Sequence, residues 1–391
     1  MPQAVSVSGG AAAPSLSRLL RRRIVELDGL RALAVLGVIS FHYTVGTRLE
    51  LAAARLGWAG VDLFFVLSGF LITGILLEMR ARPHYFRTFY TRRILRIFPA
   101  YYLLLAVYFV CARTMGGPQP WQFWAMHAAF LSSTLGYFHS WNFPAPVFVY
   151  GGSIVLWSLS VEEMFYLFWA PVVKYLQPRV MAGLVGAMIL VAPVLRVWLH
   201  RPWIPEYYFF PARMDSLAWG AAIALLLHHG GAALAWLRRW LLPHLAAGVA
   251  LLAVLIRYTG GALRKSPVFA AFGYTLLSGI FALALTWIVL HADSKNWICR
   301  LMRQQPWQQL GKTSYMIYLI HYPLVFLVAM ALGSRLGNGA LHTAVQDGLG
   351  FGLAVGLAAL SWRYFESPIL RLKDRLAPRE APKARAAGQP A

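Results

Sequence analysis

Apolar runs long enough to cross a lipid bilayer recur along this chain, and they constrain its fold more than any other feature. A helix of about 20 apolar residues matches the hydrocarbon thickness, and only structures that satisfy their own backbone hydrogen bonds survive in lipid. Hydrophobic residues make up 59% of the 391 residues and charged residues only 13%. We therefore predict an all-α, polytopic helical membrane protein with about ten transmembrane helices. The predicted spans are residues 30–46, 60–79, 98–114, 153–173, 181–200, 209–228, 240–256, 268–290, 313–333 and 343–362.

The positions of the basic residues predict the orientation of these spans. If the N-terminal tail is inside, the basic loop Arg80–Arg96 is inside as well. A further apolar stretch, Trp121–Tyr137, is ambiguous: if it does not span, the later basic clusters also fall inside, and if it does, they move outside. The positive-inside rule favours the first alternative, with both termini cytoplasmic. The loop with Arg257, Arg264 and Lys265 is the exception to this pattern.

Charge and cysteine content exclude other classes of protein. The net charge of +22 lies in short loops and tails, as expected for segments that face anionic lipid, so we predict the lipid bilayer and no nucleic acid as a partner. Two cysteines and no Cys/His spacing predict no metal. Residues 1–23 are predicted to be a flexible basic cytoplasmic tail and 371–391 a disordered one. Any chemistry is therefore expected in the membrane domain, residues 24–370.

The first predicted span carries two costly side chains, Arg31 and His42. Eleven helical steps of about 100° leave them on one face, separated by about 16 Å along the axis. Arg31 by itself is equally well explained as a snorkelling interfacial arginine. A histidine within a span costs several kcal/mol unless it is paired or lines a cavity. His42 is therefore a catalytic candidate.

Two further clusters combine charge with helical spacing. Arg93 and Arg96 lie three residues apart at the inner mouth of the third span, where their guanidinium groups suit phosphate oxygens, although simple anchoring explains them equally well. Glu162 and Glu163 lie within an aromatic-rich span and point about 100° apart, so at most one should face the cavity of His42. Tyr166, four residues on, favours Glu162 slightly.

Depth in the membrane orders the remaining candidates. His321 falls near the midplane and resembles His42 in cost. Asp62 near the outer end of its span is a catalytic candidate, but a helix N-cap explains it at least as well. Basic residues at the inner face, with His42, Glu162 and His321 deeper, suit a phosphate-bearing ligand that enters from the cytoplasm and reaches inward to a base. The inner basic residues are Arg31, Arg92, Arg93 and Arg96.

Several segments, taken together and in order, resemble the acyltransferase-3 family of integral membrane O-acyltransferases, which includes O-antigen and exopolysaccharide O-acetylases. The resemblance runs from about Ile24 to Leu370. It rests on "LDGLRALAVLGVISFH", "GVDLFFVLSGFLIT", "RRILRIFPAY", "WSLSVEEMFY", "RMDSLAWGA", "SYMIYLIHYPL" and "FESPIL". The extracytoplasmic SGNH-type domain of some members is not matched, so a standalone form in a bacterial inner membrane is expected.

The resemblance implies an acyl-CoA donor, usually acetyl-CoA on the cytoplasmic side, and a hydroxyl acceptor, commonly on a sugar or glycolipid. It also implies that His42 is catalytic, that Arg31, Arg93 and Arg96 serve the donor, and that Glu162 is essential to the site. His42 as a general base and His42 as an acylated intermediate both remain open. The alternatives are a proton-coupled transporter with a His/Glu relay and a scaffold without chemistry.

Overall fold

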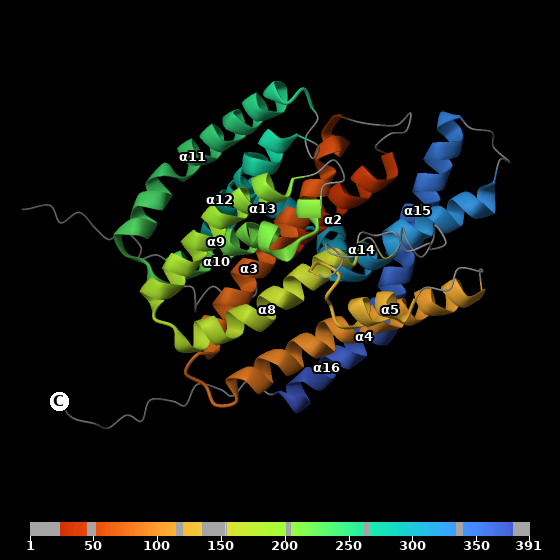
Figure 1. Ribbon diagram of the computed structural model, residues 1–391, viewed down its shortest axis with the longest axis horizontal. Coiled ribbons are helices and arrows are strands. Elements are labelled where there is room, and N and C mark those ends of the chain that lie inside the picture. Colours follow the sequence, from red (N-terminus) through yellow and green to blue (C-terminus); the bar gives the residue numbers. More distant parts are fainter. Residues whose placement is uncertain are drawn as a thin grey trace, which may run out of the picture.

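The computed structural model describes residues 24–44, 52–114, 120–134, 153, 155–200, 205–261, 266–333 and 339–377. These residues form helices and connecting turns, with no strand among them, so the all-α prediction is confirmed. Figure 1 shows the helices packed as a bundle, with α11 along one edge and α4 beside α16 along another. The chain is a multi-pass membrane protein.

Each of the ten predicted spans corresponds to a long helix. These helices are α2 (Glu26–Thr44), α3 (Gly60–Met79), α4 (Tyr85–Thr114), α8 (Trp157–Tyr175), α9 (Pro178–Leu199), α10 (Phe210–His229), α11 (Gly231–Tyr258), α12 (Tyr274–Leu290), α14 (Gln305–Leu332) and α15 (Ala340–Ser361). The shorter elements are η1 (Ala52–Ala59), α5 (Trp121–Ala128), η2 (Pro205–Tyr207), the π-helices η3 (Phe269–Gly273) and η4 (Trp362–Glu366), α13 (Trp297–Met302) and α16 (Ser367–Leu376).

Helix α3 lies at the centre of the bundle, where close backbone approach fixes its neighbours. A Cβ atom added at Gly69 would lie 2.0 Å from the carbonyl oxygen of Leu217 on α10, and one added at Gly220 would lie 2.0 Å from that of Val66. A Cβ at Gly311 on α14 would lie 1.9 Å from the carbonyl oxygen of Asp28 on α2. Small residues at helix crossings are typical of membrane bundles, because association in lipid depends on tight packing.

Within the described residues, eight helices are long and apolar enough to cross a membrane. Helices α2 and α8 do not reach this apolarity. In α2 the acidic first turn is followed by Arg31, and α8 holds Glu162 and Glu163. The two helices that deviate carry two of the four predicted catalytic side chains, His42 and Glu162. The count of ten spans stays a prediction.

Two segments clarify the predicted topology. The described part of the ambiguous stretch forms only the eight-residue helix α5, followed by turns up to residue 134. Such a helix is about 12 Å long, far less than the hydrocarbon thickness. Residues 371–376, predicted as the start of a tail, form the end of α16, which packs against α4. Residues 1–23 and 378–391 lie outside the described residues.

Candidate active site

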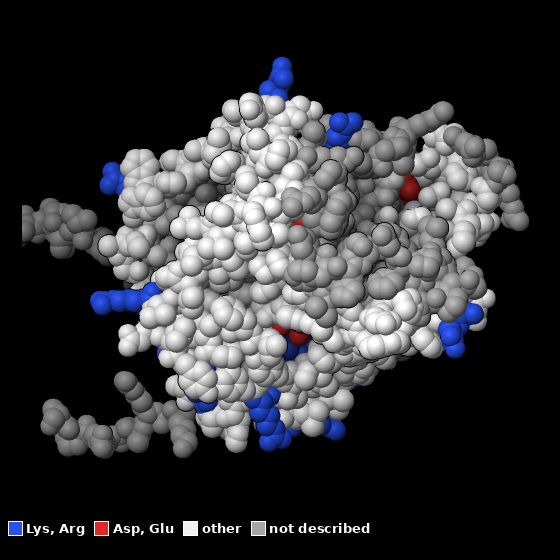
Figure 2. Space-filling view, in the orientation of Figure 1, with Lys and Arg blue, Asp and Glu red and all other residues white. Residues whose placement is uncertain are grey.

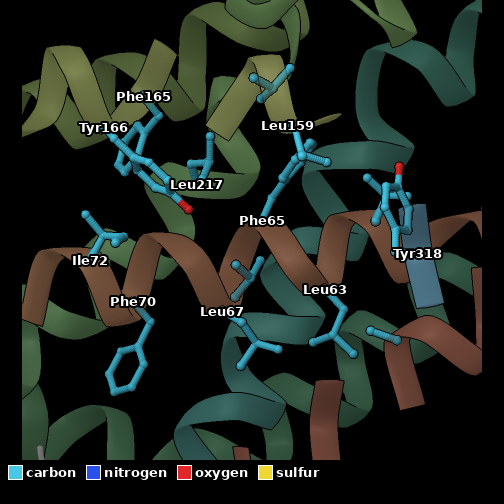
Figure 3. Packing of buried hydrophobic residues seen from close by; sticks show 14 of the residues in the cluster. Leu63, Phe65, Leu67, Phe70, Ile72, Leu159, Phe165, Tyr166, Leu217 and Tyr318 are labelled. Carbon is cyan, nitrogen blue, oxygen red and sulfur yellow. The ribbon is translucent and has the colours of Figure 1, made fainter. Parts of the chain in front are cut away.

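A cavity of about 450 Å³ lies between α2, α3, α4, α8 and α14. Its lining changes in character from one end to the other. Arg31, Arg93, Arg96 and Lys312 contribute cationic groups at what we call the basic end, where α4 and α14 begin. Figure 3 shows the apolar wall along α3, with Ile72 facing Tyr166 and, further along, Phe65 beside Leu159. The structure therefore places the three predicted donor-binding arginines around one space.

The arginines at the start of α4 divide between two directions. Arg93 and Arg96 line the cavity, and the guanidinium of Arg93 lies 5.3 Å from the ring centroid of Tyr166. Neither forms an ion pair with a carboxylate within the described part of the chain. Arg92 turns away and donates hydrogen bonds of 2.9 and 2.6 Å to the carbonyl oxygen of Ala377. The pair three residues apart is thus left available for an anionic ligand.

Glu162 lines the middle of this cavity, whereas Glu163 does not. The carboxylate of Glu162 accepts a hydrogen bond of 2.5 Å from Ser68 and one of 3.1 Å from the hydroxyl of Tyr166. The i, i+4 pairing with Tyr166 is the one that the sequence favoured. Figure 2 shows acidic and basic atoms adjoining in a hollow between α8 and α4.

His42 and His321 meet although 279 positions separate them in the chain. His321 Nδ1 lies 2.7 Å from the carbonyl oxygen of Tyr318, and its Nε2 lies 3.1 Å from Nδ1 of His42. A carbonyl only accepts, so we assign the proton of neutral His321 to Nδ1. His42 must then donate through Nδ1 to His321, which leaves its Nε2 with a lone pair. This tautomer is the one a general base needs.

The histidine pair does not line the cavity, which ends at Val61, Phe64 and Tyr318. The ring centroids of Tyr318 and His321 lie 5.7 Å apart. Successive residues three apart on α14 turn by about 300°, so His321 is rotated by about 60° relative to Tyr318. His42 is partly exposed and His321 is fully buried. The pair therefore lies just behind the apolar end of the cavity.

Asp62 does not join this site. The cavity-lining residues of α3 repeat at three- and four-residue intervals from Val61, whereas Asp62 lies about 100° away, on the side of Val66 and Gly69 that faces α10. Its carboxylate accepts a 2.5 Å hydrogen bond from Arg213, and both side chains are fully buried. Asp215, two residues after Arg213, pairs with a different arginine, Arg196, at 2.9 Å. This geometry supports the structural interpretation of Asp62.

Loss of the Asp62 carboxylate should therefore destabilise the protein. Asp62→Ala leaves Arg213 charged and unpaired in a buried position, and breaking a buried pair in this way costs about 3–5 kcal/mol. We expect a clear drop in the thermal unfolding temperature in detergent. Asp374→Ala is the matched control, because its pair with Arg92 has a carboxylate side chain that is 68% exposed and should contribute about 0–1 kcal/mol. Equal shifts in both variants would contradict the prediction.

Sequence reasoning missed several polar residues that line the cavity. They include Ser68, Ser158, Lys312, Tyr315 and Tyr318, and also Asp28, Glu78 and Ser314. Lys312, Tyr315 and Tyr318 repeat every three residues on α14 and lead towards His321, a spacing that is visible in the sequence. The serines carry no comparable signal, because serine is common in membrane helices and its role depends on which helix it faces.

Comparison with known families identifies the class. Residues 24–363 match the family described as an acyltransferase domain, Acyl_transf_3. The match covers most of the chain, and the chain belongs to this family. It includes α2, α3, α4, α8 and α14, the helices that position the cavity and the histidine pair.

The relatives give this class a chemistry. The chain is 28% identical over 372 residues to "Peptidoglycan O-acetyltransferase OatA" of Listeria monocytogenes, covering 90% of this chain and 57% of that protein. It is 31% identical over 372 residues to "Putative peptidoglycan O-acetyltransferase YrhL" of Bacillus subtilis, covering 89% and 55%. "O-acetyltransferase OatA" of Staphylococcus aureus is 26% identical over 380 residues, covering 89% and 57%. The chain thus spans just over half the length of these relatives. No solved structure matches it.

Proposed function

We propose that this chain is a membrane O-acetyltransferase that moves an acetyl group from cytoplasmic acetyl-CoA to a hydroxyl of a cell-surface sugar. The observation that carries the proposal is one cavity with cationic groups at one end and a histidine pair behind the other. The family and the names of the relatives support acyl transfer. They give no support to the transporter alternative.

The donor would enter the cavity with its phosphates at the basic end. Coenzyme A carries several phosphate charges, and guanidinium forks bind phosphate oxygens in charge-assisted hydrogen bonds. Arg93 and Arg96 have no competing ion pair within the described residues. Arg31 is in contact with Asp28 at 2.8 Å, which fixes its side chain at the cavity wall. The thioester would then lie towards the apolar end.

His42 would act as the general base for the acceptor. Nε2 of His42 carries the lone pair, and removal of the hydroxyl proton lets the oxygen attack the thioester carbonyl. The C–S bond then breaks, and the proton on His42 passes to the departing coenzyme A thiolate. His321 would orient His42 through the bond between the two rings. Glu162, held by Ser68 and Tyr166, would line the donor's path. Direct transfer is the simpler route, because it needs no acylated enzyme.

The proposal is tested with the purified full chain in lipid nanodiscs. Acetyl-CoA labelled in its acetyl group is supplied with peptidoglycan fragments, because the relatives are named for that acceptor. We expect release of the coenzyme A thiol together with label on the sugar. Binding of acetyl-CoA is measured in parallel by thermal shift. If the protein neither binds acetyl-CoA nor releases the thiol, the proposed function is wrong. Binding without transfer to peptidoglycan would show that the acceptor is a different hydroxyl compound.

A further inference from the structure

Two aromatic side chains meet at the apolar end of the donor cavity, and one of them contacts the histidine pair. Phe64 of α3 and Tyr318 of α14 both line the cavity, and their ring centroids lie 6.2 Å apart in an edge-to-face arrangement. On the far side, the ring of Tyr318 lies 5.7 Å from that of His321. Figure 3 shows Tyr318 at the end of α3 where Leu63 lies, away from Tyr166 and Ile72. A ligand in the cavity therefore meets Tyr318 before it meets the histidine pair.

Hydrogen bonds hold Tyr318 in its place across the cavity end. Its hydroxyl lies 2.7 Å from Oγ of Ser158 and 3.0 Å from the carbonyl oxygen of Val155. Ser158 lies in the first turn of α8 and Val155 in the turn just before it, so the contacts tie α14 to the start of α8. Tyr318 is 7% exposed and Ser158 is 5% exposed. The ring is therefore fixed by buried polar contacts, which are expected to favour one position over others.

The separation has a chemical consequence for the proposed reaction. A base that can activate a sugar hydroxyl can also activate water, which is present at far higher concentration. If water from the basic end reached His42 and the thioester together, its oxygen would attack the carbonyl and the C–S bond would break. One proton of the water would go to the coenzyme A thiolate, and the products would be acetic acid and the free thiol. An open path would thus waste the donor.

We propose that Tyr318, held by Ser158 and packed on Phe64, determines specificity for a hydroxyl acceptor over water. It keeps the thioester and the water of the donor cavity apart from His42 until the ring moves during transfer. This inference rests on the proposed O-acetyltransferase function and adds to it a residue that selects the acceptor. Tyr318 takes no part in the making or breaking of bonds, so it is a positioning residue.

The test compares two rates in the full chain in nanodiscs: acetate release from acetyl-CoA without acceptor, and acetyl transfer with acceptor. The rate of acetate release divided by the rate of acetyl transfer measures the leak to water. Tyr318→Phe removes the hydroxyl but keeps the ring. Because both buried contacts of the hydroxyl are lost, with Ser158 and with Val155, we expect the ratio to rise at least about tenfold. Phe64→Ala removes one of the two rings and should raise the ratio at least as much.

Tyr85→Phe is the matched control. The hydroxyl of Tyr85 is buried and donates a 2.9 Å hydrogen bond to the carbonyl oxygen of Ala170 on α8, but Tyr85 does not line the cavity. Its ratio should stay at the wild-type value. Combining Tyr318→Phe with His42→Ala should abolish the excess acetate release, because the leak would use the same base. A merely structural role of Tyr318 would lower both rates together and leave the ratio unchanged.

The outcomes separate the two proposals. If the wild-type protein consumes no acetyl-CoA with or without acceptor, the proposed function itself is wrong, and the role of Tyr318 falls with it. If it transfers acetyl groups, but the ratio in Tyr318→Phe and Phe64→Ala equals that of the wild type, the selective role of Tyr318 is overturned while the function stands. An equal rise in Tyr85→Phe would also overturn it, because a general loosening of α8 would then explain the leak.

Discussion

His42→Ala is expected to reduce kcat for acetyl transfer by about 10³-fold, because a positioned general base contributes about 10²–10⁴-fold. The variant retains the donor cavity, since His42 does not line it. KM for acetyl-CoA should therefore change little. The measurement is steady-state release of the coenzyme A thiol with acceptor at saturating concentration, together with thermal unfolding in detergent to confirm that the variant is folded.

A suitable control for this experiment is His244→Ala. His244 lies on the exposed helix α11, and its Nδ1 contacts the carbonyl oxygen of Trp240 in the same helix. It should retain wild-type turnover, because no residue of α11 lines the cavity. If His42→Ala turned over acetyl-CoA as fast as His244→Ala, His42 could not be the base, and His321 would take its place as the candidate.

The double variant Arg93→Gln, Arg96→Gln is expected to raise KM for acetyl-CoA by at least about 100-fold. A hydrogen bond to a charged group contributes about 1.5–3 kcal/mol, and each 1.4 kcal/mol corresponds to a factor of ten in affinity. The loss of two such groups is therefore enough to raise KM 100-fold, even when their effects are not additive. KM should also become less sensitive to salt, because fewer charges are screened. Initial rates over a range of acetyl-CoA concentrations at low and high salt measure both effects.

The neighbouring arginine provides a control with the same change of charge in the same helix. Arg92 points away from the cavity and bonds to Ala377 and Asp374 of the α16 region. Arg92→Gln should therefore leave KM near the wild-type value. A rise in KM for Arg92→Gln comparable with that for the double variant would show that net charge at the basic end, rather than direct contact, governs donor affinity.

Sequence spacing predicted the parts of this site that depend on a single helix. The Arg93/Arg96 pair and the pairing of Glu162 with Tyr166 follow from three- and four-residue intervals, and the structure shows both around one cavity. Helical period and hydropathy are local properties, so they can be found in a single sequence. The same applies to the positions of the ten long helices.

The remaining features depend on which helices meet. The contact between His42 and His321 requires α2 to pack on α14, where Gly311 allows close backbone approach to Asp28. Depth in the membrane indicated both histidines but not that they touch. Asp62 was predicted from depth alone, and its neighbour Arg213 on α10 could not be inferred from position in the chain. The aromatic pair at the cavity end was missed for the same reason.

The low apolarity of α2 and α8 has a consequence for biogenesis. Acidic and basic residues at the centre of a helix oppose its transfer into lipid by about 2.5–3.5 kcal/mol each. A helix such as α8, with Glu162 and Glu163 within it, is therefore a poor substrate for insertion by itself. It needs α3 to be in place first, because Ser68 on α3 donates a hydrogen bond to the carboxylate of Glu162. The order of synthesis meets this need, because α3 precedes α8 along the chain. A protein truncated after α8 but lacking α3 should leave α8 outside the bilayer.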